Sequence, residues 1–197
     1  ASYRRQRQMC IRDSGKGSNV KNILSHFQEI DDININLVAT NNPNSPVIQY
    51  AKDFNVDSRL FHRKEFSKSG YLLQLVQCYN IDLVVLAGFL LMIPEEFVQN
   101  FKGRIINVHP SLLPHYGGKG MYGDRVHNAV LANKEIKSGI TFHYVNENYD
   151  EGKIIKQFEV SLSEEESLNS LKKKINALEM THFPQIISML NDEQFQA

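Results

Sequence analysis

Two side chains that could act together on a carbonyl group lie near the middle of the sequence. Asn107 and His109 lie at the carboxyl end of the apolar run Arg104-Ile-Ile-Asn-Val108. Residues at i and i+2 of a strand point to the same face of a sheet. An amide can donate a hydrogen bond to a carbonyl oxygen, and an imidazole can donate or accept a proton near neutral pH. The pair predicts carbonyl polarisation with proton transfer, although a lone histidine is more often a structural group.

A carboxylate stands farther along the chain, where a turn follows an alternating strand. Asp150 lies in Tyr149-Asp-Glu-Gly152, and His143 lies on the preceding strand. Most aspartates in turns bond to their own backbone. Asp150 gains a chemical role only where the fold brings it beside His109, since Asn, His and Asp would then polarise a carbonyl, handle a proton and orient a water molecule.

A glycine-containing turn, Ser14-Gly-Lys-Gly-Ser-Asn19, runs directly into a predicted helix. Glycine permits positive φ and close backbone approach, and a helix N-terminus offers free amides and partial positive charge. Such a turn can hold a phosphate. The alternative is a structural capping loop with Ser18 as the helix cap.

Short apolar blocks alternate with helix-like stretches, which predicts an α/β fold with right-handed crossovers. Buried parallel strands are expected at residues 37–40, 83–86 and 104–108, because these runs are continuous and rich in branched side chains. Helices are expected over 19–30, 46–54, 66–79 and 94–101, and alternating strands over 139–145 and 153–160. A last helix is expected over 163–190, with Ser163 and Glu166 as its capping box. The fold class is therefore a doubly wound, mostly parallel, Rossmann-like sheet with an antiparallel excursion near the C-terminus.

The first 13 residues fit this pattern badly. A central strand is expected before the glycine turn, and such a strand should be nearly all apolar, yet this segment carries four arginines. One interpretation is a solvated arm that leaves the sheet one strand short. The other, which we favour, is a non-native segment, because residues 5–14 resemble peptides translated from sequencing-adapter read-through. Residues 14–197 are then a single domain, with a phosphate-binding half (14–100) and a catalytic half (101–197).

Composition excludes several classes of partner. The 197 residues include 22 Lys+Arg and 22 Asp+Glu, so no global basic field attracts nucleic acid or a membrane. The longest apolar run, residues 83–93, is shorter than the roughly 20 residues that span a bilayer. The isolated Cys10 and Cys78 predict neither a disulfide framework nor a metal site, and no histidines pair at i, i+4. We expect a cytoplasmic protein with small-molecule substrates and no metal, as a monomer or homodimer.

Four motifs, in their order and spacing, resemble the phosphoribosylglycinamide formyltransferase family of the folate-dependent formyltransferase superfamily. They are Gly-x-Gly-Ser-Asn at 15–19, Leu-Ala-Gly-Phe at 86–89, Asn-x-His-Pro-Ser-Leu-Leu-Pro at 107–114 and Asp-x-Gly at 150–152. The resemblance covers about residues 14–190. It implies the formyltransferase fold and an enzyme that transfers the formyl group of 10-formyltetrahydrofolate to the amine of glycinamide ribonucleotide in de novo purine biosynthesis.

The resemblance also implies roles for individual residues. Asn107 and protonated His109 would stabilise the oxyanion, while Asp150 would hold His109 charged and organise a proton-relaying water. The implied ribonucleotide-binding residues are Gly15, Lys16, Gly17, Ser18, Asn19 and Glu179. The implied folate-binding residues are Phe89, Leu90, Ile93, Asn107, His143 and Asp150.

Two features depart from the family or extend it. Leu90-Leu-Met-Ile93 lacks an arginine that many members carry there as a candidate partner for anionic groups. The loop Gly117-Gly-Lys-Gly-Met-Tyr-Gly123 is interpreted as a flap over the phosphate or ribose, with a solvated surface loop as the alternative. His127, at the start of the next helix, could face the site or serve a structural role.

Other functions within the superfamily fit less well. Methionyl-tRNA formyltransferase carries an additional tRNA-gripping domain and formyltetrahydrofolate deformylase a regulatory domain, and the sequence shows neither. A sugar-nucleotide N-formyltransferase stays open as an alternative. So does a non-catalytic folate- or nucleotide-binding fragment.

Overall fold

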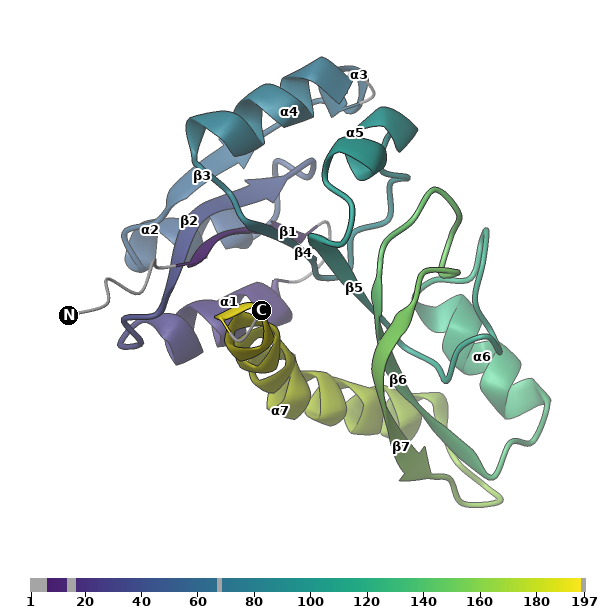
Figure 1. Cartoon of the computed structure of the whole chain (residues 1–197). Coiled ribbons are helices and arrows are strands. Elements are labelled where there is room, and N and C mark those ends of the chain that lie inside the picture. The colour runs from purple at the N-terminus through teal and green to yellow at the C-terminus, as the bar shows by residue number, and fades with distance from the viewer. Residues whose placement is uncertain (1–6, 14–16, 67–68, 196–197) are drawn as a thin grey trace.

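The computed structural model of the chain describes residues 7–13, 17–66 and 69–195. Its helices and strands alternate along most of this length (Figure 1). The strands are β1 (Arg7–Asp13), β2 (Ile33–Thr40), β3 (Asp57–Leu60), β4 (Leu83–Leu86), β5 (Ile105–His109), β6 (Lys137–Tyr144) and β7 (Ile154–Ser161). The helices are α1 (Ser18–Phe27), α2 (Val47–Asp53), α3 (Arg63–Phe66), α4 (Ser69–Cys78), α5 (Glu95–Asn100), α6 (Asp124–Ala132) and α7 (Leu168–Phe195).

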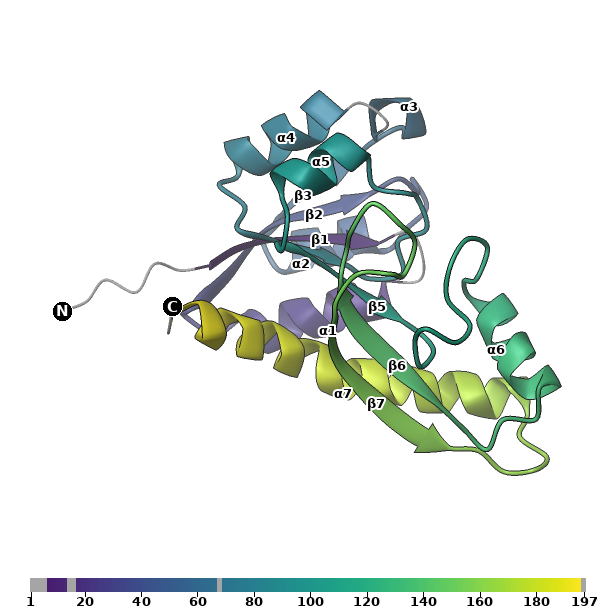
Figure 2. The ribbon, with the colours of Figure 1, turned by 45° about the vertical axis from the view of Figure 1, so that its right-hand side comes forward.

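The strands form one sheet in the order β3-β2-β1-β4-β5-β6-β7. Strands β1 to β5 are parallel, whereas β6 runs antiparallel to β5 and β7 antiparallel to β6. The β6–β7 pair lies at one end of the sheet, where α7 packs against it (Figure 2). The predicted doubly wound, mostly parallel sheet with a C-terminal antiparallel excursion is confirmed.

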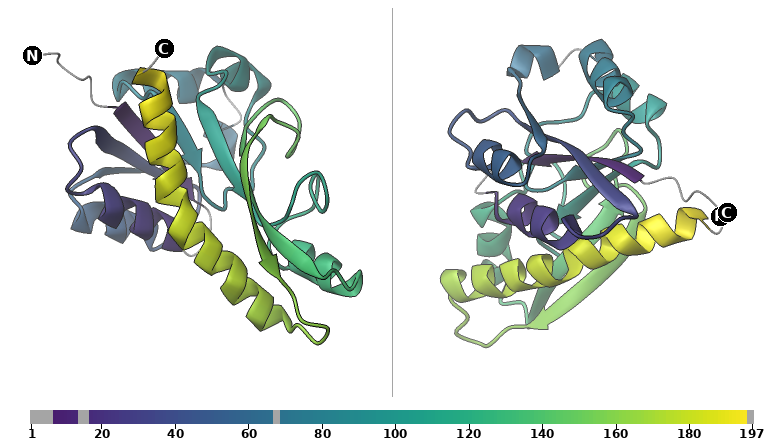
Figure 3. Two further views of the ribbon diagram at one scale, coloured as in Figure 1. Left: turned by 60° about the horizontal axis from the view of Figure 1, so that its bottom comes forward. Right: turned by 90° about the vertical axis from the view of Figure 1, so that its left-hand side faces the viewer.

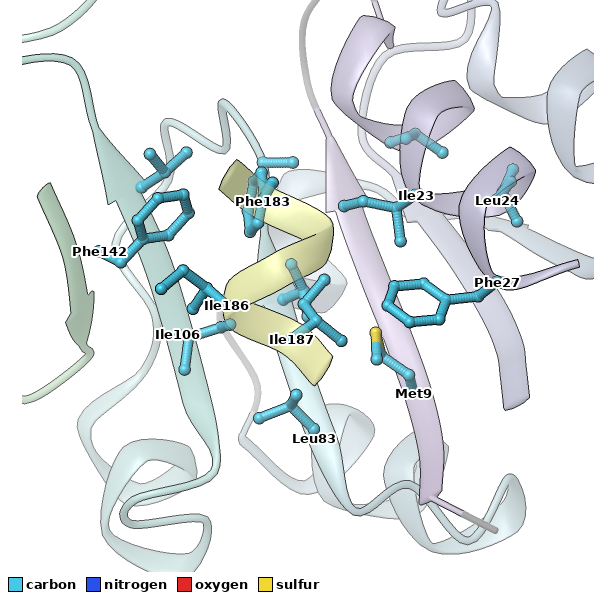
Figure 4. Packing of buried hydrophobic residues seen from close by; sticks show 14 of the residues in the cluster. Met9, Ile23, Leu24, Phe27, Leu83, Ile106, Phe142, Phe183, Ile186 and Ile187 are labelled. Atoms are coloured by element: carbon cyan, nitrogen blue, oxygen red, sulfur yellow. The ribbon is translucent and has the colours of Figure 1, made fainter. Parts of the chain in front are cut away.

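Two hydrophobic cores sandwich the sheet. One lies between helices α1, α2 and α7 and one face of the sheet, and it includes Met9 of β1, Phe142 of β6 and Phe183 of α7 (Figure 4). The other lies between α4 and α5 and the opposite face, where Leu72 and Phe97 are fully buried. Helices on both faces explain why the central strands lack polar alternation. The short edge strand β3 escaped prediction because its sequence, Asp-Ser-Arg-Leu, has no apolar run.

The alternative interpretation of the charged N-terminal segment, a solvated arm that leaves the sheet one strand short, is wrong for residues 7–13. These residues form β1, the central strand, paired in parallel with β2 on one side and β4 on the other. Met9 is fully buried against α1 and α7 (Figure 4). Backbone pairing to two neighbouring strands places β1 here despite its polar composition. The suggestion that the segment is non-native stays a hypothesis.

The long helix α7 crosses the sheet from the β6–β7 end back to α1 (Figure 3). Its start differs from the prediction: Glu166 accepts hydrogen bonds from Ser163 in a separate turn, and Ser167 caps the helix by accepting from the Ser170 amide. Within the helix, Pro184 cannot donate to the carbonyl of Met180. The Asn22 side chain of α1 donates to that carbonyl instead, at 2.8 Å, so α1 and α7 are tied together.

None of the helices in the described ranges is long and apolar enough to cross a membrane.

Candidate active site

A cavity of about 390 Å³ opens at the carboxyl ends of the central strands. The chain leaves β1 towards β2 on one side, whereas β4 lies on its other side, so the strand order reverses between β1 and β4. Open α/β sheets bind ligands at such a reversal. This cavity is lined by polar side chains from four parts of the fold: Asn19 of α1, Asn107 and His109 of β5, Asp150 of the β6–β7 loop and Glu179 of α7.

The three residues expected to act on a carbonyl group are brought together. Asp150, 41 positions beyond His109 in the sequence, has its Oδ2 atom 3.4 Å from His109 Nδ1. Both side chains are largely buried, with 5% of His109 and 12% of Asp150 exposed. An ionic contact shielded from water is stronger than one on the surface. The fold therefore supplies the neighbour that gives Asp150 a chemical role.

The backbone around Asp150 fixes where its carboxylate points. Asp150 adopts φ 56°, a left-handed conformation that aspartate tolerates better than most residues. Its Oδ2 atom also accepts a hydrogen bond from the Gly118 amide at 3.0 Å. The loop at 117–123 thus contacts the catalytic candidate Asp150 directly. A Cβ atom on Gly117 of this loop would collide with Leu113.

Both ring nitrogens of His109 face acceptors. Nε2 donates to the carbonyl oxygen of Tyr116 at 2.8 Å, and Nδ1 faces the Asp150 carboxylate. An imidazole donates from both ring nitrogens only when both carry protons. One ring nitrogen of His109 thus meets a backbone carbonyl and the other a carboxylate.

A buried hydroxyl holds the turn that follows His109. Thr141 of β6 donates from Oγ1 to the carbonyl of Ser111 at 2.7 Å and accepts from the amide of Leu113 at 3.0 Å. Gln157 of β7 donates to the same hydroxyl at 2.9 Å and to the Leu113 carbonyl at 2.9 Å. These bonds fix the 109–114 turn to the antiparallel part of the sheet.

Replacing Thr141 by valine should destabilise the protein strongly. The substitution keeps the shape but strips the Leu113 amide and the Ser111 carbonyl of a buried partner, at about 1–3 kcal/mol for each group. We expect urea denaturation to show a loss of about 2–4 kcal/mol. Thr141→Ser, which keeps the hydroxyl, is the control and should lose clearly less; equal losses in the two variants would contradict the assigned network.

The far end of the cavity carries a second polar pair. Asn19 at the start of α1 donates from Nδ2 to Glu179 Oε2 at 2.7 Å. Desolvation by burial raises the pKa of Glu179, and the bond from Asn19 opposes that rise only in part. The Asn19 Oδ1 atom is buried and has no hydrogen-bond partner among the described residues. This end of the cavity therefore offers an acceptor and a carboxylate to an incoming polar ligand.

The predicted phosphate turn is only partly described. Gly15 and Lys16 lie outside the described residues. Gly17 adopts φ 74° and occupies the N-cap position of α1, so Ser18 is the first helical residue and not the cap. Ser18 is exposed, whereas Asn19 lines the cavity.

The predicted folate-binding residues divide between two neighbouring spaces that share lining residues. Leu90 lines the large cavity, and Ile93 and His143 line a smaller one of about 70 Å³. Phe89, Asn107 and Asp150 border both. The apolar walls and the polar groups between the spaces resemble a site for a flat ring beside a reacting centre.

Several residues that line the cavity were not among the predicted catalytic, ribonucleotide-binding or folate-binding residues. The 117–123 loop forms one wall of the cavity, to which it contributes Gly118, Met121 and Tyr122. This position favours the interpretation of the loop as a flap over the site and not as a solvated surface loop. His127 lines the cavity from α6, and its buried Nδ1 atom has no hydrogen-bond partner in the part of the chain that the structure describes. Lys172 also lines it and pairs with Asp124 at 2.6 Å. Only the glycine-rich composition of the loop had signalled this wall.

No group of three or more His, Cys, Asp or Glu side chains that could hold a metal ion occurs among the residues that the structure describes. The prediction that the chain uses no metal stays a prediction.

The two buried histidines of this region should make folding depend on pH. Desolvation lowers the pKa of His127 and of His143, while both titrate near about 6.5 in an unfolded chain. As the pH falls through about 6.5, the unfolded state therefore binds more protons than the folded state. The stability that the two neutral histidines contribute is complete above that pH and is lost below it. Each imidazole contributes a slope of at most about 1.4 kcal/mol per pH unit.

Urea denaturation at pH 7.5, 6.5 and 5.5 measures this loss. Glu179, whose pKa is raised, acts in the opposite sense because its folded form takes up a proton first. We expect the parent to lose stability over this range and His127→Phe to lose less. A parent whose stability is constant or rises towards pH 5.5 would contradict the argument.

Known proteins are similar to this chain in sequence and in architecture. Residues 8–187 match the family described as formyl transferase. The chain is 33% identical over 201 residues to the chloroplastic phosphoribosylglycinamide formyltransferase of Arabidopsis thaliana, a match that covers 98% of this chain and 68% of the relative. It is 32% identical over 182 residues to the phosphoribosylglycinamide formyltransferase of Bacillus subtilis, covering 90% and 91% of the two chains.

Solved structures agree with these matches. The phosphoribosylglycinamide formyltransferase of Anaplasma phagocytophilum superimposes with a TM-score of 0.87 at 28% identity, covering 96% of this chain and 89% of the other. That of Bacillus halodurans gives a TM-score of 0.83 at 29% identity, covering 93% and 95%.

Proposed function

The chain belongs to the formyl transferase family, and we propose that it transfers the formyl group of 10-formyltetrahydrofolate to the amine of glycinamide ribonucleotide in de novo purine biosynthesis. The observation that carries the proposal is the cavity lined by Asn107, His109 and Asp150, because Asn107 and Asp150 also border the smaller space beside it. One space suits the ribonucleotide and the other the folate ring.

In the proposed reaction the amine nitrogen attacks the formyl carbon, and the bond from that carbon to the folate nitrogen then breaks. Negative charge develops on the formyl oxygen in between. Asn107 donates an amide hydrogen to this oxygen, and the His109 imidazolium offers its Nδ1 proton, which the 3.4 Å contact to Asp150 holds only loosely. Donors of this kind contribute about 10²–10³ in rate each.

Asp150 has two tasks in this scheme. Its charge keeps His109 in the imidazolium form, and its carboxylate orients the water that carries a proton from the attacking amine to the departing folate nitrogen. The Gly118 amide keeps one carboxylate oxygen in place throughout. The amine thus loses a proton and the folate nitrogen gains one, so the reaction needs no external acid.

The ribonucleotide would lie along the wall between α1 and α7. Its phosphate would bind at the N-terminus of α1, where free amides and the helix dipole favour an anion. Glu179 would contact the glycinamide portion, since it lies in the cavity beside Asn19. The pterin ring would enter the smaller space lined by Ile93 and Val145, with Phe89 between the two ligands.

A spectrophotometric assay of formyl transfer tests the proposal. The purified chain is mixed with a 10-formyl folate, with and without glycinamide ribonucleotide, and release of the free folate is followed. We expect turnover that requires the ribonucleotide. Turnover with an amino-sugar nucleotide in its place would identify a sugar-nucleotide N-formyltransferase, and binding of the ligands without turnover would identify a binding protein.

The compartment and the assembly remain predictions. We expect the enzyme in the cytoplasm, although the Arabidopsis thaliana relative is described as chloroplastic. A monomer and a homodimer are both compatible with the proposed site.

A further inference from the structure

We propose that His143 is a positioning residue that holds the Asn107 amide in the one orientation that presents a donor to the formyl oxygen. The proposal rests on the formyl transfer proposed above. It gives His143 a task separate from contact with the folate, which was the role implied by the family resemblance.

The sheet places the two side chains against each other. Asn107 on β5 and His143 on β6 are directly opposite in the antiparallel register, so their side chains stand on the same face. Asn107 Nδ2 lies 3.1 Å from His143 Nε2. Only 2% of His143 is exposed, and water therefore does not compete for this hydrogen bond.

The other ring nitrogen determines the direction of the bond. His143 Nδ1 lies 3.0 Å from the carbonyl oxygen of Tyr144, which can only accept, so Nδ1 carries a proton. In the neutral ring Nε2 then has a free lone pair and accepts from Asn107. One amide hydrogen of Asn107 is used in this way, and the second is left for the substrate.

The neutral ring also fits the charges around it. Asp150 Oδ1 lies 3.6 Å from His143 Nε2, and His109 is the other titratable group that acts on the ring. Burial lowers the pKa of His143 more strongly than the Asp150 carboxylate raises it. Because His143 brings no positive charge, the Asp150 carboxylate is left to serve His109 and the Gly118 amide.

The orientation matters because the two ends of an amide have nearly the same shape and opposite chemistry. Rotated by half a turn, Asn107 would present its Oδ1 atom, an acceptor, to the developing oxyanion. Repulsion would then replace stabilisation. An acceptor at His143 penalises the rotated state, since Oδ1 and Nε2 would face each other without a proton between them.

A matched pair of variants tests the role. Glutamine and methionine have unbranched side chains of nearly equal length, but only glutamine carries a strong acceptor at its end. We expect His143→Met to lower kcat about 10- to 100-fold, less than the roughly 10²–10³ expected from removing the Asn107 donor itself. We expect KM for the ribonucleotide to change less than threefold, and His143→Gln to recover most of the lost kcat.

A double-variant cycle shows whether His143 acts through Asn107. In the Asn107→Ala background, we expect His143→Met to lower kcat by less than a further threefold. The full additional loss in that background would overturn the proposal, as would equal kcat values for the glutamine and methionine variants. Circular dichroism and thermal unfolding of each variant show that the compared proteins are folded.

The ¹⁵N chemical shifts of the His143 imidazole give a test that needs no turnover. At pH 7 we expect a protonated Nδ1 and an unprotonated Nε2 that responds to Asn107→Ala. A doubly protonated ring, or the opposite tautomer, would overturn the proposal even in an active enzyme. If the parent shows no formyl transfer to any amine but has this tautomer, the proposed function fails while the hydrogen bond stands.

Discussion

Asp150→Asn is expected to lower kcat by about 10²–10⁴ while ribonucleotide affinity stays within threefold. The substitution keeps the size of the side chain and an oxygen for the Gly118 amide. It removes the negative charge 3.4 Å from His109 Nδ1, so the imidazolium loses its partner and the water loses its base. The ribonucleotide end depends on a separate pair, Asn19 with Glu179, and should be unaffected.

Steady-state kinetics and titration calorimetry with the ribonucleotide measure the two effects separately. Glu151→Gln is the matched control, because it removes the charge of the adjacent, exposed carboxylate. Its kcat should stay within twofold of the parent. Unchanged turnover in Asp150→Asn would remove this carboxylate from the mechanism.

Gly17→Val is expected to weaken ribonucleotide binding at least tenfold. A Cβ atom on Gly17 would meet Val47 Cγ1 at 2.7 Å and Tyr50 at 3.1 Å, on the side of α2. The backbone also has φ 74°, where a β-branched residue is strained. Both effects displace the start of α1, which the phosphate would contact.

Gly103→Val separates the two effects. Gly103 has a similar φ of 72°, but a Cβ atom there would meet nothing within 4 Å. We expect this variant to lose about 1–2 kcal/mol of stability with unchanged ribonucleotide affinity. Calorimetric titration of both variants measures the affinities, and equal affinity in Gly17→Val and the parent would refute the assignment of this turn.

The periodicity of the sequence was enough to predict the fold class. Continuous branched runs at 83–86 and 104–108 indicated strands covered on both faces, and helices do cover both faces. The same reasoning failed for β1 because composition reports burial of side chains, whereas a central strand is also held by its backbone bonds to both neighbours. It placed the start of α7 at Ser163 because a capping motif can also close an isolated turn.

The sequence allowed individual residues of the candidate site to be predicted. The spacing of Asn107 and His109 indicated a shared face, and the resemblance to a family added Asp150 and Glu179. Neither the spacing nor the resemblance predicted which residues these side chains contact. Asp150 reaches His109 because β6 turns back antiparallel to β5, and Asn19 reaches Glu179 across 160 positions because α7 returns to α1.

The sequence by itself determined which chemical groups the protein carries and which segments must be buried, since both follow from residue type and local period. The tertiary structure alone decided which groups meet. Ring nitrogens of His109 and His143 meet the carbonyls of Tyr116 and Tyr144, and the Asn107 amide meets His143 across the strands. Such pairings depend on strand register and on distances of a few ångströms, which local sequence does not encode.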